Sequence, residues 1–203
     1  IKDGEIVLDD TELTADYLKG INQIVITACG SAYYAGCAGK YAIEKLCRIP
    51  VRVELASELR YCDPIIDEHT LLIVISQSGE TADTIAAMIE CKNRGAKTLA
   101  IVNVVGSTIA NTADHTLYTW AGPEIAVATT KGYTTQLTLL YLFALYTAKK
   151  TEKISDEDYS KLLKELNSLP KKVQEALDMS SAIPELAKKY YKINSMFFLG
   201  RNT

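Results

Sequence analysis

Leu71-Leu-Ile-Val-Ile75 is an unbroken run of large apolar residues, and Ser76-Gln-Ser-Gly-Glu-Thr81 follows it directly. A short run of this kind, rich in β-branched residues, predicts a strand that is buried on both faces. A helix is expected next, from about residue 81 to residue 94, with Gly95 ending it. The apolar stripe expected to face the core consists of Ala82, Ile85, Ala86 and Ile89.

The same order of strand, turn and helix recurs through the first 148 residues. Four further strands are predicted at Ile24–Cys29, Val51–Leu55, Thr98–Asn103 and Thr116–Trp120. Two further helices are predicted at Tyr33–Cys47 and Thr129–Ala148, the second burying Leu137, Leu140, Tyr141 and Ala144. Strands that alternate with helices predict an α/β fold, here a three-layer αβα sandwich around a five-stranded parallel sheet, doubly wound as in flavodoxin.

Composition excludes several classes of function. Of the 203 residues 48% are apolar, and the chain has 22 Lys and Arg residues and 25 Asp and Glu residues. These values describe a folded protein with no basic surface for nucleic acid. The longest apolar run, Leu139–Tyr146, is far shorter than the roughly 20 residues of a membrane helix. The chain opens on no signal peptide, and its five cysteines include no Cys-x-x-Cys pair, so we expect reduced thiols and a cytoplasmic location.

The polar turn Ser76–Thr81 opens a helix, and helix N-termini carry unpaired N–H groups and partial positive charge. Ser76, Gln77, Ser78 and Thr81 add neutral hydrogen-bonding groups, and Gly79 allows close approach of the backbone, which suits a phosphate group. Glu80 opposes this interpretation, and a Ser/Thr-rich helix cap without a ligand is the alternative. The motifs Gly-x-x-x-x-Gly-Lys and Gly-x-Gly-x-x-Gly are absent, which favours a phosphorylated metabolite smaller than a nucleotide.

Two other polar turns follow predicted strands. Ser31 comes after Gly30 at the end of the first strand, and Thr129 lies at the start of the last helix. Because the carboxyl ends of parallel strands meet at one edge, the three turns predict one pocket, although Thr129 alone could be an N-cap. His69 and His115 lie far apart and outside these turns, so we expect no metal site, no cofactor and no catalytic residue, and Lys131 is expected to be solvated.

Four segments, taken together, resemble a known family. They are Thr27-Ala-Cys-Gly-Ser-Ala-Tyr-Tyr-Ala-Gly36, Glu54-Leu-Ala-Ser-Glu-Leu-Arg-Tyr61, Ser76-Gln-Ser-Gly-Glu-Thr-Ala-Asp-Thr84 and Glu124-Ile-Ala-Val-Ala-Thr-Thr-Lys131. The third is typical of sugar isomerase (SIS) domains in general. The second and fourth resemble the isomerase half of the glutamine–fructose-6-phosphate aminotransferases in particular.

The resemblance implies an SIS fold that binds a hexose 6-phosphate. The implied substrate-binding residues are Ser31, Ser76, Gln77, Ser78, Thr81, Val127, Ala128 and Thr129, with Gly30, Ala32 and Gly79 in support. Two positions depart from the family pattern, which often has Ser where Ala32 stands and usually has Ser where Thr129 stands. Ala32 loses a hydroxyl contact, whereas Thr129 keeps one.

Four sections are expected along the chain. Residues 1–23 form a linker and a helix, and residues 24–148 form the SIS domain. Residues 149–194 form a charged helical connector, which Pro170 and Pro184 divide into helices at about 155–168, 171–179 and 184–192. Residues 195–203, which include Phe198-Leu-Gly-Arg201, resemble the first strand of a second SIS domain, so we expect a piece of a longer chain.

The reaction implied by the resemblance converts fructose 6-phosphate and glutamine into glucosamine 6-phosphate and glutamate. A glutaminase domain and the second SIS domain would supply ammonia and the main catalytic residues, so this segment is expected to bind sugar phosphate without completing the reaction. A homodimer is expected as well. The alternatives are a non-catalytic module that senses phosphosugars and another SIS isomerase, acting on a phosphoheptose or arabinose 5-phosphate.

Overall fold

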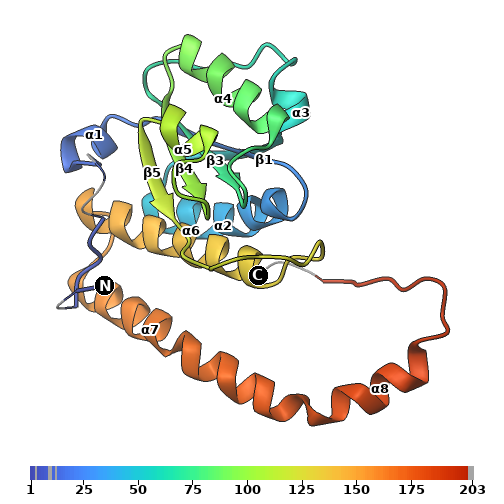
Figure 1. The fold of residues 1–203 in the computed structure, drawn as a ribbon. Helices are drawn as coiled ribbons and strands as arrows, with labels where there is room; N and C mark the ends of the chain where they lie inside the picture. Colours follow the sequence, from blue (N-terminus) through green and yellow to red (C-terminus); the bar gives the residue numbers. More distant parts are fainter. Residues whose placement is uncertain (3, 9–10, 12, 201–203) are drawn as a thin grey trace. The chain divides into compact units, whose positions relative to one another are not determined.

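Five parallel strands form one sheet in the order β2-β1-β3-β4-β5 (Figure 1). The computed structural model describes residues 1–200 except 3, 9–10 and 12. The strands are β1 (Gln23–Ala28), β2 (Val51–Leu55), β3 (Thr70–Ser76), β4 (Lys97–Val102) and β5 (His115–Tyr118). This order, with its reversal between β1 and β3, is that of the doubly wound flavodoxin-like folds, which confirms the expected architecture.

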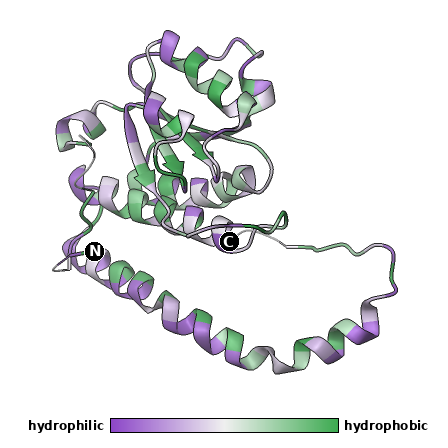
Figure 2. Cartoon of the chain, in the orientation of Figure 1, coloured by the Kyte–Doolittle hydropathy of each residue, from purple (hydrophilic) through white to green (hydrophobic). Residues whose placement is uncertain are grey.

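Helices cover both faces of the sheet. One face packs against α1 (Ala15–Lys19), α2 (Ser31–Cys47) and α6 (Lys131–Lys150), and the other against α3 (Ala56–Leu59), α4 (Ala82–Asn93) and α5 (Thr108–Thr112). Each face of the sheet has its own hydrophobic core. Successive residues of β3 point alternately into one core and the other, so all seven of its residues are buried. Figure 2 shows the hydrophobic character of these central strands.

Helix α4 is found where it was expected, but the expected inward face is wrong. Ile89 is 44% exposed, and the buried positions are Thr84, Ala87, Met88 and Cys91. Apolar residues occur on more than one side of this short helix, so the sequence period alone does not determine which side packs on the sheet.

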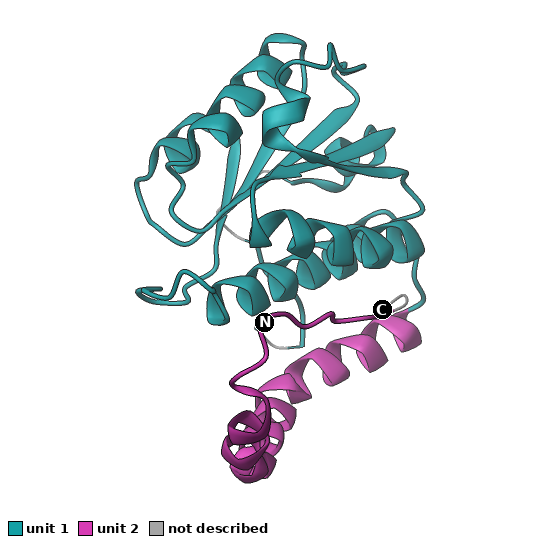
Figure 3. Ribbon diagram, turned by 90° about the vertical axis from the view of Figure 1, so that its right-hand side faces the viewer, with its two compact units in different colours: residues 1–155 teal, residues 156–203 magenta. Residues whose placement is uncertain are grey.

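Residues 156–203 form a separate compact unit, drawn in magenta in Figure 3, which includes most of the charged connector expected at residues 149–194. It contains α7 (Asp156–Asp178), the 3-10 turn η1 (Met179–Ala182) and α8 (Ile183–Tyr190). The expected break at Pro170 is wrong, because α7 continues through it. Proline removes one helical hydrogen bond, and the residues after it, Lys171–Leu177, are mostly good helix formers that sustain the next turns.

Residues 195–200 have no regular secondary structure, where a strand was expected to begin. A strand forms only when a neighbouring strand takes up its backbone hydrogen bonds, and no strand in the described part of the chain pairs with this segment. Residues 201–203, the end of that expected strand, lie outside the described residues. The second SIS domain therefore stays a prediction.

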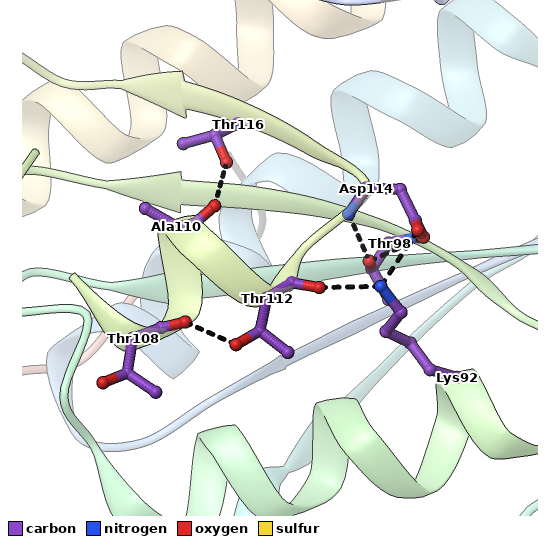
Figure 4. Close-up of polar contacts among 7 residues, drawn as sticks. All are labelled: Lys92, Thr98, Thr108, Ala110, Thr112, Asp114 and Thr116. Atoms are coloured by element: carbon purple, nitrogen blue, oxygen red, sulfur yellow. Dashed lines mark hydrogen bonds and ion pairs between the residues drawn. The ribbon is translucent and has the colours of Figure 1, made fainter. Parts of the chain in front are cut away.

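A polar cluster ties the edge of the sheet to α4 (Figure 4). The Asp114 carboxylate accepts hydrogen bonds from the N–H and the hydroxyl of Thr98, both at 2.8 Å, and from Lys92 Nζ at 2.9 Å. Lys92 Nζ also donates to the carbonyl of Thr112 at 2.7 Å. Burial opposes ionisation of Asp114, but the hydrogen bonds from Lys92 and Thr98 outweigh it and lower its pKa.

This cluster predicts acid-sensitive stability. Because the folded-state pKa of Asp114 lies below the unfolded value of about 3.9, its contribution is complete above that pH and is lost as the pH falls through the folded pKa. Asp114→Asn is expected to lower the free energy of unfolding at neutral pH by about 2 kcal/mol and to remove this acid dependence. Urea unfolding across a pH series measures both effects.

The control is Asp83→Asn in the first turn of α4, since Asp83 forms a partly exposed ion pair with Arg60, at 3.3 Å. Equal losses of stability in the two variants, with equal dependence on pH, would contradict the role given to Asp114.

Candidate functional site

Hydroxyl groups shape the turn that follows β3. Ser76 Oγ accepts the N–H of Gly79 at 3.0 Å and lies 3.0 Å from Thr81 Oγ1, and Ser78 Oγ accepts the N–H of Glu80 at 3.2 Å. Thr81 occupies the N-cap position of α4, yet its side chain makes no capping hydrogen bond. The turn is therefore held by its own serines, and the first turn of α4 keeps N–H groups for an external acceptor.

Gly79 has a backbone φ of +70°, which side-chain-bearing residues rarely adopt. A Cβ at this position would overlap the hydroxyl of buried Ser107 and lie 2.5 Å from its Cβ. The carbonyl of Gly79 also accepts the N–H of Ile109 at 3.0 Å. Both conformation and space therefore require glycine here.

Glu80 belongs to the same turn but does not line the cavity that lies beside this turn. Its carboxylate accepts the N–H and the hydroxyl of Thr108, both at 2.7 Å, at the start of α5. The backbone hydrogen bond, followed by the side-chain one, lowers the pKa of Glu80 and keeps it ionised. The negative charge of Glu80, which in the sequence opposed a phosphate site, is thus bound to the first residue of α5.

A second carboxylate organises the turn before α6. Glu124 Oε2 accepts the Thr129 hydroxyl at 3.0 Å and the Gly132 N–H at 3.3 Å, while Oε1 accepts the Ala126 N–H at 3.2 Å. The bond from Ala126 contributes most to lowering the pKa of Glu124, and the bonds from Thr129 and Gly132 add to it against an opposing effect of burial. Thr129 is not the N-cap of α6, a position that Thr130 occupies. Glu124 orients the Thr129 hydroxyl instead.

A cavity of about 170 Å³ lies at the carboxyl ends of β1 and β3, where the strand order reverses. This is the position at which doubly wound sheets bind ligands. Six of the expected substrate-binding residues line it, together with the supporting residue Ala32. The lining consists of Cys29, Ser31, Ala32, Ile75, Ser76, Gln77, Ser78, Thr81, Thr129 and Gln136.

Four of the binding and supporting residues expected from the sequence do not line the cavity. Val127 and Ala128 are exposed, and the N–H of Thr129 bonds to the Val127 carbonyl at 2.9 Å, so this turn presents their side chains to solvent. Gly30 and Gly79 act through the backbone: Gly30, with φ +58°, precedes the first turn of α2, which carries Ser31.

Three lining residues were not expected from the sequence: Cys29, Ile75 and Gln136, of which Gln136 is the polar one with a side-chain amide. It lies on α6 and is 3% exposed, whereas its neighbour Leu137, expected on the buried side, is half-buried. A signal was present, because Gln136 stands four residues before Leu140, which was expected on the buried side, and that spacing returns to the same face of a helix.

The lining offers hydrogen bonds rather than an acid–base pair. His69 Nδ1 lies 3.1 Å from the carbonyl of Gly20, and the His115 ring packs edge-on against Tyr17, so both histidines lie away from the cavity. In the part of the chain that the structure describes, His, Cys, Asp and Glu side chains form no group that could hold a metal ion. None of the described helices is long and apolar enough to cross a membrane. The arrangement suits recognition of an anionic, hydroxylated ligand.

The fold and the cavity define a sugar isomerase domain, and comparison with known proteins agrees. The SIS domain family model matches residues 17–146, more than half of the chain, and the chain belongs to this family. Along nearly its whole length the chain is similar to aminotransferases that carry such domains.

Two bacterial relatives named glutamine–fructose-6-phosphate aminotransferase [isomerizing] are each 53% identical to the chain. The protein from Clostridium tetani matches over 197 residues, 97% of this chain and 32% of the relative. The protein from Caldanaerobacter subterraneus matches over 201 residues, which are 99% of this chain and 33% of that relative. The chain thus spans about a third of the length of these relatives.

A solved structure, the C-terminal domain of glucosamine-fructose-6-phosphate aminotransferase from Francisella tularensis, superposes with a TM-score of 0.89. The two are 37% identical, and the match covers 95% of this chain and 54% of that one. The family resemblance read from the motifs is confirmed.

Proposed function

We propose that this chain binds a hexose 6-phosphate in the cavity between the ends of β1 and β3. It would serve as the first SIS domain of an enzyme that makes glucosamine 6-phosphate from fructose 6-phosphate and glutamine. The observation that carries the proposal is the convergence of Ser31, the Ser76–Thr81 turn and Thr129 on one cavity, in a chain similar to aminotransferases over nearly its whole length.

The phosphate would bind to the Ser76–Thr81 turn. Hydroxyl groups and the N-terminus of α4 supply donors there, and the cavity lining contains no carboxylate to repel an anion. Ser31 and Thr129 face the same space and would contact the sugar. Val127 and Ala128 would contribute main-chain groups, because their side chains lie outside the lining.

The remaining chemistry belongs to the rest of the proposed enzyme. A glutaminase domain would release ammonia, and a second SIS domain would supply the residues that open the ring and move protons. The cavity lining offers hydroxyl and amide groups, so this segment alone would bind substrate or product and leave the reaction incomplete. A cytoplasmic location stays a prediction, which the five free cysteines support.

Calorimetric titration of this chain tests the proposal. Fructose 6-phosphate and glucosamine 6-phosphate are expected to bind well above inorganic phosphate. Binding no tighter than that of phosphate would overturn it. Tighter binding of arabinose 5-phosphate or a heptose 7-phosphate would assign the cavity to another SIS isomerase.

Homodimer formation is a further prediction. Light scattering is expected to give twice the chain mass of 22.3 kDa, because α2 exposes Tyr34 and Tyr41, aromatic side chains of the kind enriched at protein interfaces. Replacing both tyrosines by serine is expected to shift the mass toward the monomer. A monomer mass for the unaltered chain at high concentration would contradict the prediction.

A further inference from the structure

We propose that Glu124 is a positioning residue of this cavity, which fixes the Thr129 hydroxyl as a hydrogen-bond acceptor and so directs a sugar hydroxyl, and not the phosphate, to that side. The inference rests on the proposed function and extends it from the class of ligand to the orientation of the ligand. Glu124 does not line the cavity itself, so it would act through Thr129, which does.

The direction of the hydrogen bond between the two side chains follows from their chemistry. Thr129 Oγ1 lies 3.0 Å from Glu124 Oε2. The hydrogen bond from the N–H of Ala126, with those from Thr129 and Gly132, lowers the pKa of Glu124, so the carboxylate is ionised at neutral pH and only accepts. Thr129 therefore gives its single hydroxyl hydrogen to Glu124, and its oxygen keeps only lone pairs for a ligand.

The Thr129 hydroxyl lies beside the opposite turn of the cavity. A Cβ on Gly132 would overlap Thr129 Oγ1 and would lie 3.6 Å from Gln77 Cγ. Gln77 belongs to the turn after β3 and lines the cavity, as Thr129 does. The half-buried Thr129 thus has its oxygen on the side where the two turns meet.

The turn after β3 has the opposite hydrogen-bond polarity. Ser78 Oγ accepts the N–H of Glu80 at 3.2 Å, so the hydroxyl hydrogen of Ser78 is left to donate. Ser76 Oγ accepts the N–H of Gly79 at 3.0 Å and lies 3.0 Å from Thr81 Oγ1. Whichever of these two hydroxyls donates to the other, one hydrogen remains for a ligand. This side of the cavity therefore offers donors, and the other side offers an acceptor.

The two helix N-termini beside the cavity differ in the same sense. Glu124 accepts the N–H of Gly132 at 3.3 Å, so a carboxylate already occupies the first turn of α6. The first turn of α4 has no side-chain cap, and its carboxylate, Asp83, pairs with Arg60 at 3.3 Å. A phosphate, with a second pKa of about 6, presents mainly negative acceptor oxygens at neutral pH. It would bind at α4, while a sugar hydroxyl donates to Thr129.

The test is calorimetric titration of the full 203-residue chain with fructose 6-phosphate and with inorganic phosphate. Thr129→Val, which removes the hydroxyl at similar size, is expected to lower affinity for fructose 6-phosphate about tenfold, the value of one hydrogen bond, and to leave affinity for phosphate unchanged. Glu124→Gln is expected to lower the first affinity about threefold without lowering the second, because an amide leaves the hydroxyl free to turn. The control is Thr138→Val on α6, whose hydroxyl bonds to the Thr134 carbonyl at 2.8 Å.

Gly132→Ala is an independent test that leaves both polar side chains in place. Alanine favours a helix over glycine, so the variant is expected to fold. Its methyl group would displace the Thr129 hydroxyl from Glu124. Affinity for fructose 6-phosphate is expected to fall as in Thr129→Val, and affinity for phosphate is expected to stay the same.

The combined variant separates action through Thr129 from any other role of Glu124. Adding Glu124→Gln to Thr129→Val is expected to cause no further loss, and a further loss would overturn the inference. Thr129→Val would also overturn it with unchanged affinity for fructose 6-phosphate, or with equal losses for both ligands. Loss of folding in both Glu124→Gln and Gly132→Ala would assign the hydrogen bond to the fold instead. If the unaltered chain does not distinguish fructose 6-phosphate from phosphate, the proposed function itself fails, and this inference with it.

Discussion

Gly79→Ala is expected to lower the free energy of unfolding by about 3 kcal/mol and to remove measurable binding of fructose 6-phosphate. Holding alanine at φ +70° costs about 1–3 kcal/mol, and forcing a methyl group against Ser107 adds a packing cost of about 1–3 kcal/mol. Any relaxation moves the Gly79 N–H away from Ser76 Oγ, which disturbs the proposed phosphate site. Urea unfolding and calorimetric titration measure the two losses.

Gly106→Ala is the matched control for this prediction. Gly106 has a similar φ of +74°, but nothing lies within 4 Å of the position its Cβ would take. It therefore isolates the conformational cost, and its loss of stability is expected to be clearly smaller. Adding Ser107→Gly to Gly79→Ala should recover part of the difference. Equal losses in the two single variants would show that the clash with Ser107 has no energetic effect.

The sheet and the placement of the turns were predictable because their signals are strong and local. Leu71–Ile75 is apolar at every position, and only a central strand between two helical layers buries both faces. Given parallel strands, the turns at Ser31 and Ser76 had to meet at one edge of the sheet. The structure accordingly finds six of the expected residues around one cavity.

Other features depend on contacts that the sequence pattern does not encode. Ile89 and Met88 are both apolar, so the choice of inward face on α4 rests on how the helix packs. Thr129 is a good N-cap residue, yet its hydroxyl donates to Glu124, five residues earlier in the same turn. Gln136 was overlooked because a polar residue within an apolar helix is ordinarily placed on the solvent side.

Ser76→Ala combined with Ser78→Ala is expected to weaken hexose-phosphate binding by about 2–3 kcal/mol, since each hydrogen bond to a charged group contributes about 1.5 kcal/mol. The two single substitutions should differ in whether they affect stability as well as binding. Ser76 is buried and accepts the Gly79 N–H, so Ser76→Ala should also reduce stability. Ser78→Ala should weaken binding alone, because the Glu80 N–H that it releases belongs to an exposed residue.

Inorganic phosphate tests which part of the ligand this serine pair binds. If the Ser76–Thr81 turn holds the phosphate group, the double serine variant loses affinity for phosphate and for fructose 6-phosphate together. Ser168→Ala on α7, whose hydroxyl bonds only to the Glu165 carbonyl at 2.7 Å, serves as the control. Unchanged affinity of the double variant for both ligands would remove the turn from the site. Loss for fructose 6-phosphate alone would place the sugar, rather than the phosphate, against the serines.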